Sequence, residues 1–481
     1  MNFRIAVICG TLLLAMGGCQ KTDNINPNVP ATVNPGVVLP QVLYNVSNTL
    51  TLSAFEINNE LMQYTCMNNT FTEVQRFKLQ PANSNQLWNL YNRLRDLNDI
   101  DRMVENGTGH PNYRAMSGIL RVFILSVITD AFGDVPYTEA GAASAGNIFT
   151  PKYDTQETIY AGLIAELQQY TQAIDVNGAL DFGGDLVYQG DMLRWKKFGN
   201  SLLLRLLMRT SEQQPQQASA LIGQLLADPA QYPVMESNAD NFIYRYQGSF
   251  PDVFPLAPSY VRDFDFKYKS VSAFVVDSLT KFGDARLHQF ARPTNASADS
   301  DNPVYVGLPN ALPVTESANY NGGYNYQSYL GTRFQSDREP AIWMTAPEVF
   351  FLKAEAAIRN FYPGDAQQAY HDGIKHSFEY WDAPFSADYL THPSVAYDGG
   401  LPKVYLQKYF SLFFTGIEAW SDYRRTGYPR LVPGPTNVND GRIPSRLPYP
   451  LSEQSLNQNN YHEASQRIGG DDMNSKMWWQ Q

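Results

Sequence analysis

The stretch LPKVYLQKYFSLFFTGIEAWSDYRRTGYP, from Leu401 to Pro429, decides the fold of this chain. Its apolar residues recur at three- and four-residue spacing and fall on two faces. The first face holds Leu406, Tyr409, Phe413, Ile417 and Trp420, and the second holds Phe410 and Phe414. This spacing predicts one helix that is apolar on both faces and lies inside a large core. Gly427 and Pro429 predict where it ends.

Three charged residues lie on the polar side of this predicted helix, namely Glu418, Asp422 and Arg425. The four-residue spacing of the two acids places their β-carbons roughly 6 Å apart, near the separation of the carboxyl pair in a retaining glycosidase. Arg425 on the same face favours the ionised form of both acids and removes the raised pKa that a general acid needs. We therefore predict a buried, charge-paired network and no catalytic residues.

Composition indicates a globular protein with a large core. The chain has 481 residues, of which 43% are hydrophobic and 13% aromatic, and this length allows up to three domains. There are 47 acidic and 36 basic residues, which give a formal charge of -11, and no run of Lys or Arg follows a phosphate backbone. We therefore expect no nucleic-acid partner.

The N-terminus is typical of a secreted lipoprotein. One positive charge at Arg4 is followed by an apolar run that is too short to span a bilayer, and then by Gly17, Gly18 and Cys19. Small residues directly before a Cys resemble a lipobox, which implies cleavage after residue 18 and lipidation of Cys19. The alternative is ordinary secretion. We expect a signal peptide at 1–18, a Pro- and Asn-rich tether at 19–40 and a single domain at 41–481.

Helical periodicity recurs along the chain on both sides of an irregular middle. It predicts helices at 43–64, 85–104, 112–132, 155–174, 192–209, 271–282, 347–361 and 365–381. The last two contain many small residues and predict a tightly packed helical hairpin. Residues 231–340 are rich in Pro, Gly, Asn and aromatic residues, which favours long ordered loops and short strands.

Several motifs together resemble the SusD/RagB family, in its SusD-like branch. They are GIEAWSDYRRTGYP (416–429) after Gln407-Lys408, FGDVPY (132–137), DMLRWKKFGNSLLLRLLMR (191–209), RIPSRLPYP (442–450) and DDMNSKMWW (471–479). The resemblance implies a mainly α fold in which tetratricopeptide-like helix pairs form a right-handed superhelical scaffold, with an irregular, loop-rich subdomain that contains short strands. It also implies a lipoprotein of the Bacteroidetes outer membrane, facing the exterior. Such proteins capture nutrients, usually glycans, and deliver them to a TonB-dependent, SusC-like transporter.

The aromatic loops of the middle are the candidate glycan site, because tyrosine rings stack on the apolar faces of sugars while polar side chains bond the hydroxyl groups. The candidate ligand-binding residues are Tyr260, Arg262, Phe264, Tyr268, Tyr320, Tyr324, Asn325, Tyr326 and Tyr329. The alternative for any one of these tyrosines is packing of the loops on the helices. For the protein, the alternatives are a surface glycoside hydrolase, a peptide-binding lipoprotein of the same family, or a structural tetratricopeptide adaptor.

Metal and cofactor motifs are weak in this sequence. Asp299, Asp301 and Asn302 could share a calcium ion, but the loop lacks the glycine and the bidentate Glu of an EF-hand, so a solvated loop is favoured. The chain has no HExxH, CxxC or GxSxG pattern and no phosphate-binding Gly loop. We expect no cofactor and no catalytic metal.

Overall fold

The computed structural model describes residues 33–69, 72–142, 146–257 and 268–480, and residues from Pro35 onward form one compact unit. The helices of its first half are α2 (Pro35–Ser53), α3 (Asn59–Leu61), α4 (Pro81–Trp88), α5 (Tyr91–Glu105), α6 (Asn112–Phe132), α8 (Gln156–Gln172), α9 (Met192–Arg209) and α10 (Pro215–Ala227). Those of its second half are α12 (Ala273–Phe282), α13 (Leu287–Phe290), α14 (Val314–Asn319), α15 (Ala346–Ile358), α16 (Ala366–Tyr380), α17 (Leu401–Ser411), α18 (Glu418–Thr426), α19 (Leu451–Leu456) and α20 (Gln458–Arg467).

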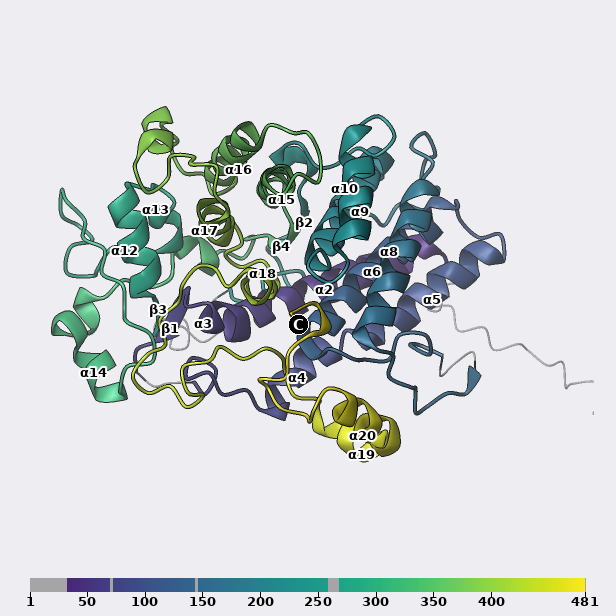
Figure 1. The fold of residues 1–481 in the computed structure, drawn as a ribbon, viewed down its shortest axis with the longest axis horizontal. Coiled ribbons are helices and arrows are strands. Elements are labelled where there is room, and N and C mark those ends of the chain that lie inside the picture. Colours follow the sequence, from purple (N-terminus) through teal and green to yellow (C-terminus); the bar gives the residue numbers. More distant parts are fainter. Residues whose placement is uncertain (1–32, 70–71, 143–145, 258–267, 481) are drawn as a thin grey trace, which may run out of the picture. The chain divides into compact units, whose positions relative to one another are not determined.

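Helices that are neighbours in sequence pack on one another in pairs (Figure 1). Helix α5 packs on α6, α6 on α8, α8 on α9, and α15 on both α16 and α17. Helix α9 also contacts α15, which joins the first set of helices to the second. Gly373 of α16 makes the predicted hairpin close, because a β-carbon there would lie 2.8 Å from the Phe351 ring. The predicted mainly helical fold of paired helices is confirmed.

The 401–429 stretch forms two helices and not one, so the prediction of a single continuous helix is wrong. Helix α17 ends at Ser411 and α18 begins at Glu418. Between them Phe414 and Gly416 have φ values of 62° and 48°, which lie outside the right-handed helical region. A β-carbon at Gly416 would lie 3.1 Å from Leu50 of α2, so the chain turns where it passes close to that helix. The bend still buries Phe413 and Trp420 completely.

The first ordered helix begins earlier than expected. Helix α2 starts at Pro35 and contains Pro40, and Leu39 is 1% exposed, so residues 35–40 belong to the folded unit. Pro35 stands at the start of the helix, where its missing N–H would have no partner, whereas Pro40 lies in the second turn and removes one backbone hydrogen bond of α2. The predicted boundary between tether and domain at residue 40 therefore moves to Pro35. The predicted signal peptide and Cys19 lie outside the described residues.

Helix α6 is the central core helix of the first half. It is the one helix in the described part of the chain that is long and apolar enough to cross a membrane, but 94% of its apolar stretch is buried inside the protein. Gly133 ends it with φ 85° and ψ -123°, a backbone conformation that side chains other than glycine rarely adopt. Helix α9 begins at the predicted cap, where Asp191 accepts a hydrogen bond from the Arg194 backbone N–H.

Two short antiparallel strand pairs occur in the described residues. Strand β2 (Phe242–Tyr244) pairs with β4 (Ala341–Met344), with Ile243 opposite Ile342 and an irregular register beside Phe242. Strand β1 (Thr65–Met67) pairs with β3 (Lys269–Val271), with Cys66 opposite Ser270. Tyr329 adds an isolated bridge to Ser270, which brings the aromatic segment 320–329 to the edge of the second pair.

Candidate functional site

The structure describes six of the nine candidate ligand-binding residues. Tyr260, Arg262 and Phe264 lie outside the described residues. The others gather around the loop that follows α14, and they are Tyr268, Tyr320, Tyr324, Asn325, Tyr326 and Tyr329. Tyr268 immediately precedes β3, and its ring lies edge-on to the Tyr324 ring with 5.6 Å between centroids. The structure therefore places Tyr268 next to the loop that follows α14.

Gln327 holds the base of the aromatic loop. Its side chain is fully buried, and its amide nitrogen donates to the backbone carbonyls of Ser317 at 2.7 Å and Tyr320 at 3.2 Å. Its amide oxygen accepts a hydrogen bond from Asn68 at 3.0 Å. Because the buried Gln327 amide makes all three hydrogen bonds, it holds the start of the loop and its own end of the loop in place beside β1. Neither Gln327 nor Asn68 was among the residues predicted for the site.

Glycines shape the tip of the loop. Three successive residues, Asn321, Gly322 and Gly323, have positive φ values of 53°, 100° and 102°. Three successive residues in the positive-φ region reverse the chain sharply, which glycine and asparagine tolerate best. The Asn321 side chain also donates to the Tyr326 carbonyl at 3.0 Å and closes the turn. The tip therefore has a defined conformation without forming a longer helix or strand.

The turn leaves two aromatic rings and one amide at the surface. Tyr324 is 38% exposed and Tyr326 is 49% exposed, and Asn325 between them is exposed as well. The Asn325 backbone carbonyl accepts a hydrogen bond from Ala296, which ties this segment to the neighbouring loop. Partly exposed tyrosines on a fixed backbone provide flat apolar surface together with hydroxyl groups. This is the surface chemistry that a sugar ring requires.

Tyr329 lies beneath this surface. It is 3% exposed, its hydroxyl donates to the Tyr324 carbonyl at 2.9 Å, and the Arg292 guanidinium lies 5.5 Å from its ring centroid. Burial raises its pKa, which keeps the hydroxyl protonated as a donor. Tyr329 therefore supports the loop, and Tyr320 is half-buried at its start. Tyr268, Tyr324, Asn325 and Tyr326 remain as candidates for direct contact.

A second aromatic surface, which sequence analysis missed, borders the same subdomain. The His288 and Tyr305 rings are stacked with centroids 5.1 Å apart, beside a hollow of about 650 Å³. Ser328, next to Gln327, connects this region to the loop: its N–H donates to the Val306 carbonyl at 2.8 Å, and its hydroxyl accepts from the Val306 N–H at 3.0 Å.

Calcium binding at Asp299 and Asp301 gains no support. Both residues are exposed, and in the described ranges no group of three or more His, Cys, Asp or Glu is arranged to hold a metal ion.

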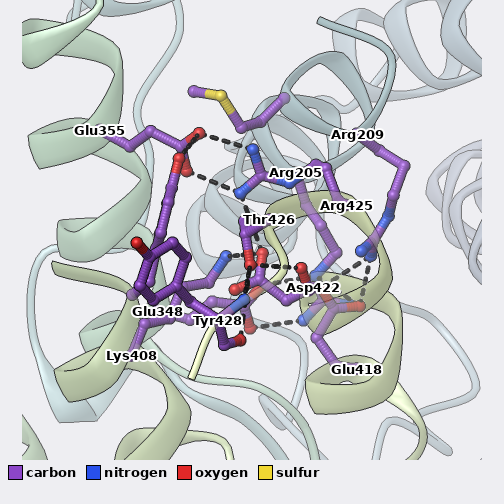
Figure 2. A network of polar contacts seen from close by, with 12 residues as sticks. Arg205, Arg209, Glu348, Glu355, Lys408, Glu418, Asp422, Arg425, Thr426 and Tyr428 are labelled. Carbon is purple, nitrogen blue, oxygen red and sulfur yellow. Dashed lines mark hydrogen bonds and ion pairs between the residues drawn. The ribbon is translucent and has the colours of Figure 1, made fainter. Parts of the chain in front are cut away.

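The charged residues of α18 form a buried network with three other helices (Figure 2). Glu418 accepts from Arg209 of α9 at 2.7 Å, and Asp422 accepts from Lys408 of α17 and from Arg425, both at 2.9 Å. Arg425 also forms a two-pronged pair with Glu355 of α15, at 2.5 and 2.7 Å. The predicted buried, charge-paired network is confirmed.

This network keeps both acids of α18 ionised. Burial raises the pKa of Glu418, but the attraction of Arg209, Arg205 and Lys408 is larger in sum and the net shift is downward. The pKa of Asp422 is likewise held well below its usual value, because Lys408 and Arg425 outweigh the effect of burial. A general acid needs the opposite shift, so this pair is not arranged for acid catalysis of glycoside hydrolysis. Its role is to join α9, α15, α17 and α18.

Comparison with known proteins identifies the family. Residues 27–450 match the SusD-like family, described as "Starch-binding associating with outer membrane". The structure resembles that of a chitin-binding protein with 28% sequence identity and a TM-score of 0.81, over 93% of this chain and 100% of that one.

Two further solved structures share the fold. A SusD homologue from Bacteroides uniformis is 25% identical with a TM-score of 0.78, over 92% of this chain and 99% of that one. A chitin-binding SusD homologue from Flavobacterium johnsoniae is 24% identical with a TM-score of 0.79, over 93% and 98%. No curated protein sequence matches the chain. The family match and the paired helices confirm what the 401–429 signature predicted: the chain belongs to the SusD-like family.

Proposed function

We propose that this protein binds glycans at the surface formed by Tyr324, Asn325 and Tyr326, as a step in nutrient uptake. The observation that carries the proposal is a pair of partly exposed tyrosines held on a fixed turn by a buried Gln327. The family is one of binding proteins, and its description names starch. Each ring offers a face for stacking on a pyranose, and Asn325 offers both a donor and an acceptor for hydroxyl groups.

Chitin oligosaccharides are the first ligands to test, because the relative with 28% identity is a chitin-binding protein. Isothermal titration with chitohexaose, and with maltoheptaose as the starch fragment, will show which glycan binds. We expect Tyr326→Ala to weaken binding by about 1–3 kcal/mol, roughly a 5- to 150-fold rise in Kd, because a stacking ring is lost. Its stability will change little, since the ring is half exposed.

The matched control is Phe149→Ala, which removes a ring that is 77% exposed on a segment outside this loop. It is expected to leave glycan binding unchanged. Equal Kd values for the wild type, Tyr326→Ala and Phe149→Ala would rule out the proposed site. Release of new reducing ends during incubation would favour a surface glycoside hydrolase, and retention of peptides alone would favour a peptide-binding lipoprotein.

We also propose that lipidation at Cys19 anchors the protein to the outer membrane on its exterior face. The support is the family's description as associating with the outer membrane, together with the short apolar run and glycines before Cys19. Cys19→Ala is expected to release the protein from membranes and to abolish metabolic labelling with palmitate. A variant that still fractionates with the outer membrane, beside a wild type without acyl label, would contradict this anchor.

A TonB-dependent, SusC-like transporter is the proposed partner. A surface protein that concentrates a glycan needs a separate carrier to move the ligand across the membrane, and the family resemblance supplies that carrier. Affinity purification of the lipidated protein from native membranes in mild detergent is expected to recover a barrel of transporter size in near-equal amount. Recovery of the protein alone would favour a free surface binder.

A further inference from the structure

A hollow of about 350 Å³ lies away from the aromatic loop, where three parts of the chain meet. The C-terminal end of α6, the N-terminal end of α8 and the segment 446–478 line it. Its walls are joined by direct contacts. The Trp478 N–H donates to the Gln156 side chain at 2.8 Å, and the Gln156 N–H donates to Asp134 at 2.9 Å. The hollow is therefore part of the ordered structure.

Arg446 lines this hollow and has one nitrogen without a partner. The side chain is 1% exposed; its Nε donates to the Phe132 carbonyl at 3.0 Å and its Nη1 donates to Asp471 at 2.6 Å. Its Nη2 is buried and makes no hydrogen bond to any described residue. A buried charged donor left unpaired costs folding free energy, so Nη2 calls for an acceptor that none of the described residues supplies.

Two further cations border the same hollow. Arg467 donates from Nε to Asp134 at 2.9 Å and from Nη2 to the Tyr153 carbonyl at 2.9 Å, which leaves Nη1 available. Lys476 is exposed and forms no ion pair within the described ranges. Three positively charged side chains thus surround one cavity in a protein whose formal charge is -11.

The acids around the hollow are mostly already paired. Asp134 and Asp471 accept from Arg467 and Arg446 respectively, so Glu157 is the acidic lining residue without an ion pair in the described structure. Glu157 lies in the first turn of α8, a helix of 17 residues whose N-terminus faces the same cavity and carries a partial positive charge. The hollow therefore has more positively charged donors than acidic side chains left to pair with them.

We propose that this hollow binds a tetrahedral oxyanion, a phosphate or sulfate group, carried on a small molecule such as a sugar. Three cationic side chains of the segment 446–478 suit the several oxygens of a phosphate or sulfate, and Arg446 and Arg467 present planar donors that pair well with such groups. A volume of about 350 Å³ exceeds what the oxyanion alone occupies, so there is room for the group that carries it.

Titration with glucose 6-phosphate, inorganic phosphate, inorganic sulfate and glucose tests this site. Glucose 6-phosphate is expected to bind, with an affinity that falls as salt is added, and glucose alone is not. Equal binding of inorganic phosphate would mean that the oxyanion alone is recognised. Tighter binding of glucose 6-phosphate would mean that the hollow also receives the sugar. The second result supports the proposal in full, the first keeps the oxyanion site but overturns the carrier, and absence of binding by all three anions overturns the site.

Substitutions with opposite expected signs separate a built site from general surface charge. Lys476→Ala is expected to raise the Kd of glucose 6-phosphate about tenfold, since one charge-assisted hydrogen bond is lost. Glu157→Gln is expected to lower the Kd, because it removes the unpaired acid. The matched control is Lys375→Ala, an exposed lysine of α16 outside the hollow, which should leave the Kd unchanged.

Equal losses in Lys476→Ala and Lys375→Ala, or a weaker affinity in Glu157→Gln, would overturn the site. All three variants change exposed side chains, so they are expected to fold as the wild type does. Chitohexaose binding is expected to stay unchanged in all three, because the aromatic loop lies elsewhere. The oxyanion site and the glycan site can therefore fail independently.

Discussion

Replacing Trp420 tests whether the signature segment is structural. The side chain is fully buried on α18: its Nε1 donates to the Pro444 carbonyl at 2.8 Å, and the guanidinium of Arg424, on the same helix, lies 3.9 Å from its ring centroid. The Trp420 backbone N–H donates to Asn58 at 3.0 Å. Removing the ring therefore opens a cavity, frees a buried carbonyl and withdraws the surface on which Arg424 rests.

The expected loss in the free energy of unfolding follows from these contacts. A fully buried Trp→Ala change costs about 3–5 kcal/mol, which includes the cavity. Trp420→Phe keeps most of the apolar ring but loses the Nε1 donor and leaves the Pro444 carbonyl unpaired, which costs about 1–3 kcal/mol. We therefore expect Trp420→Ala to be the less stable of the two variants, with glycan affinity unchanged in the fraction that remains folded.

Urea unfolding followed by far-ultraviolet circular dichroism is the suitable assay. In a chain of this length the melting temperature moves by only about 1–2 °C per kcal/mol, so the denaturant midpoint is more sensitive. Leu456→Ala serves as a control, because that residue is 76% exposed and its loss should cost less than about 0.5 kcal/mol. A Trp420→Ala protein that unfolds at the wild-type urea concentration but no longer binds glycan would refute the structural role and place Trp420 in the ligand site.

Two further predictions concern the buried network and the loop base. Asp422→Asn is expected to cost about 3–5 kcal/mol at pH 7, because Lys408 and Arg425 lose their anion. The pKa of Asp422 in the folded protein lies below its usual value. The ionised Asp422 therefore stabilises the folded state above about pH 4, and this stabilisation is lost as the pH falls. The difference from wild type should therefore shrink in acid, and a pH-independent difference in urea unfolding would contradict this. Gln327→Ala is expected to speed amide hydrogen exchange in residues 317–327 and to weaken glycan binding. Unchanged exchange would show that the Gln327 hydrogen bonds do not hold the base of the loop.

Periodicity predicted most helices but not the break within the signature. Apolar spacing continued from Tyr409 through Trp420, as it would in one helix, while Gly416 alone signalled a turn. At this turn Gly416 lies close to Leu50 of α2, which is more than 360 residues away along the chain. Local patterns record the faces of a helix but not the element that packs against it. The same limit explains why Arg209 and Glu355 were not identified as partners of α18.

The sequence predicted the exposed tyrosines of the candidate site but not the buried residues that hold them in place. The repeated tyrosines around Gly322 and Gly323 are visible in the sequence, and the structure places Tyr324 and Tyr326 at the surface. The partner of Gln327 is Asn68, 259 residues away, and no local pattern connects them. Tyr329 differs from its neighbours only in burial, which spacing within an irregular loop cannot reveal.

A continuous set of buried contacts connects the exposed rings to the helical core. Gln327 and Ser328 tie the loop to β1 and β3, and Lys269 of β3 pairs with Glu60 of α3 inside the core. Fixing the loop before the ligand arrives reduces the conformational entropy lost on binding, so two rings and an amide can suffice for useful affinity. A lone pair of exposed tyrosines on an unsupported loop would lose that advantage. At the proposed glycan site, the buried polar groups are therefore expected to act through rigidity, because they are too deep to touch a sugar.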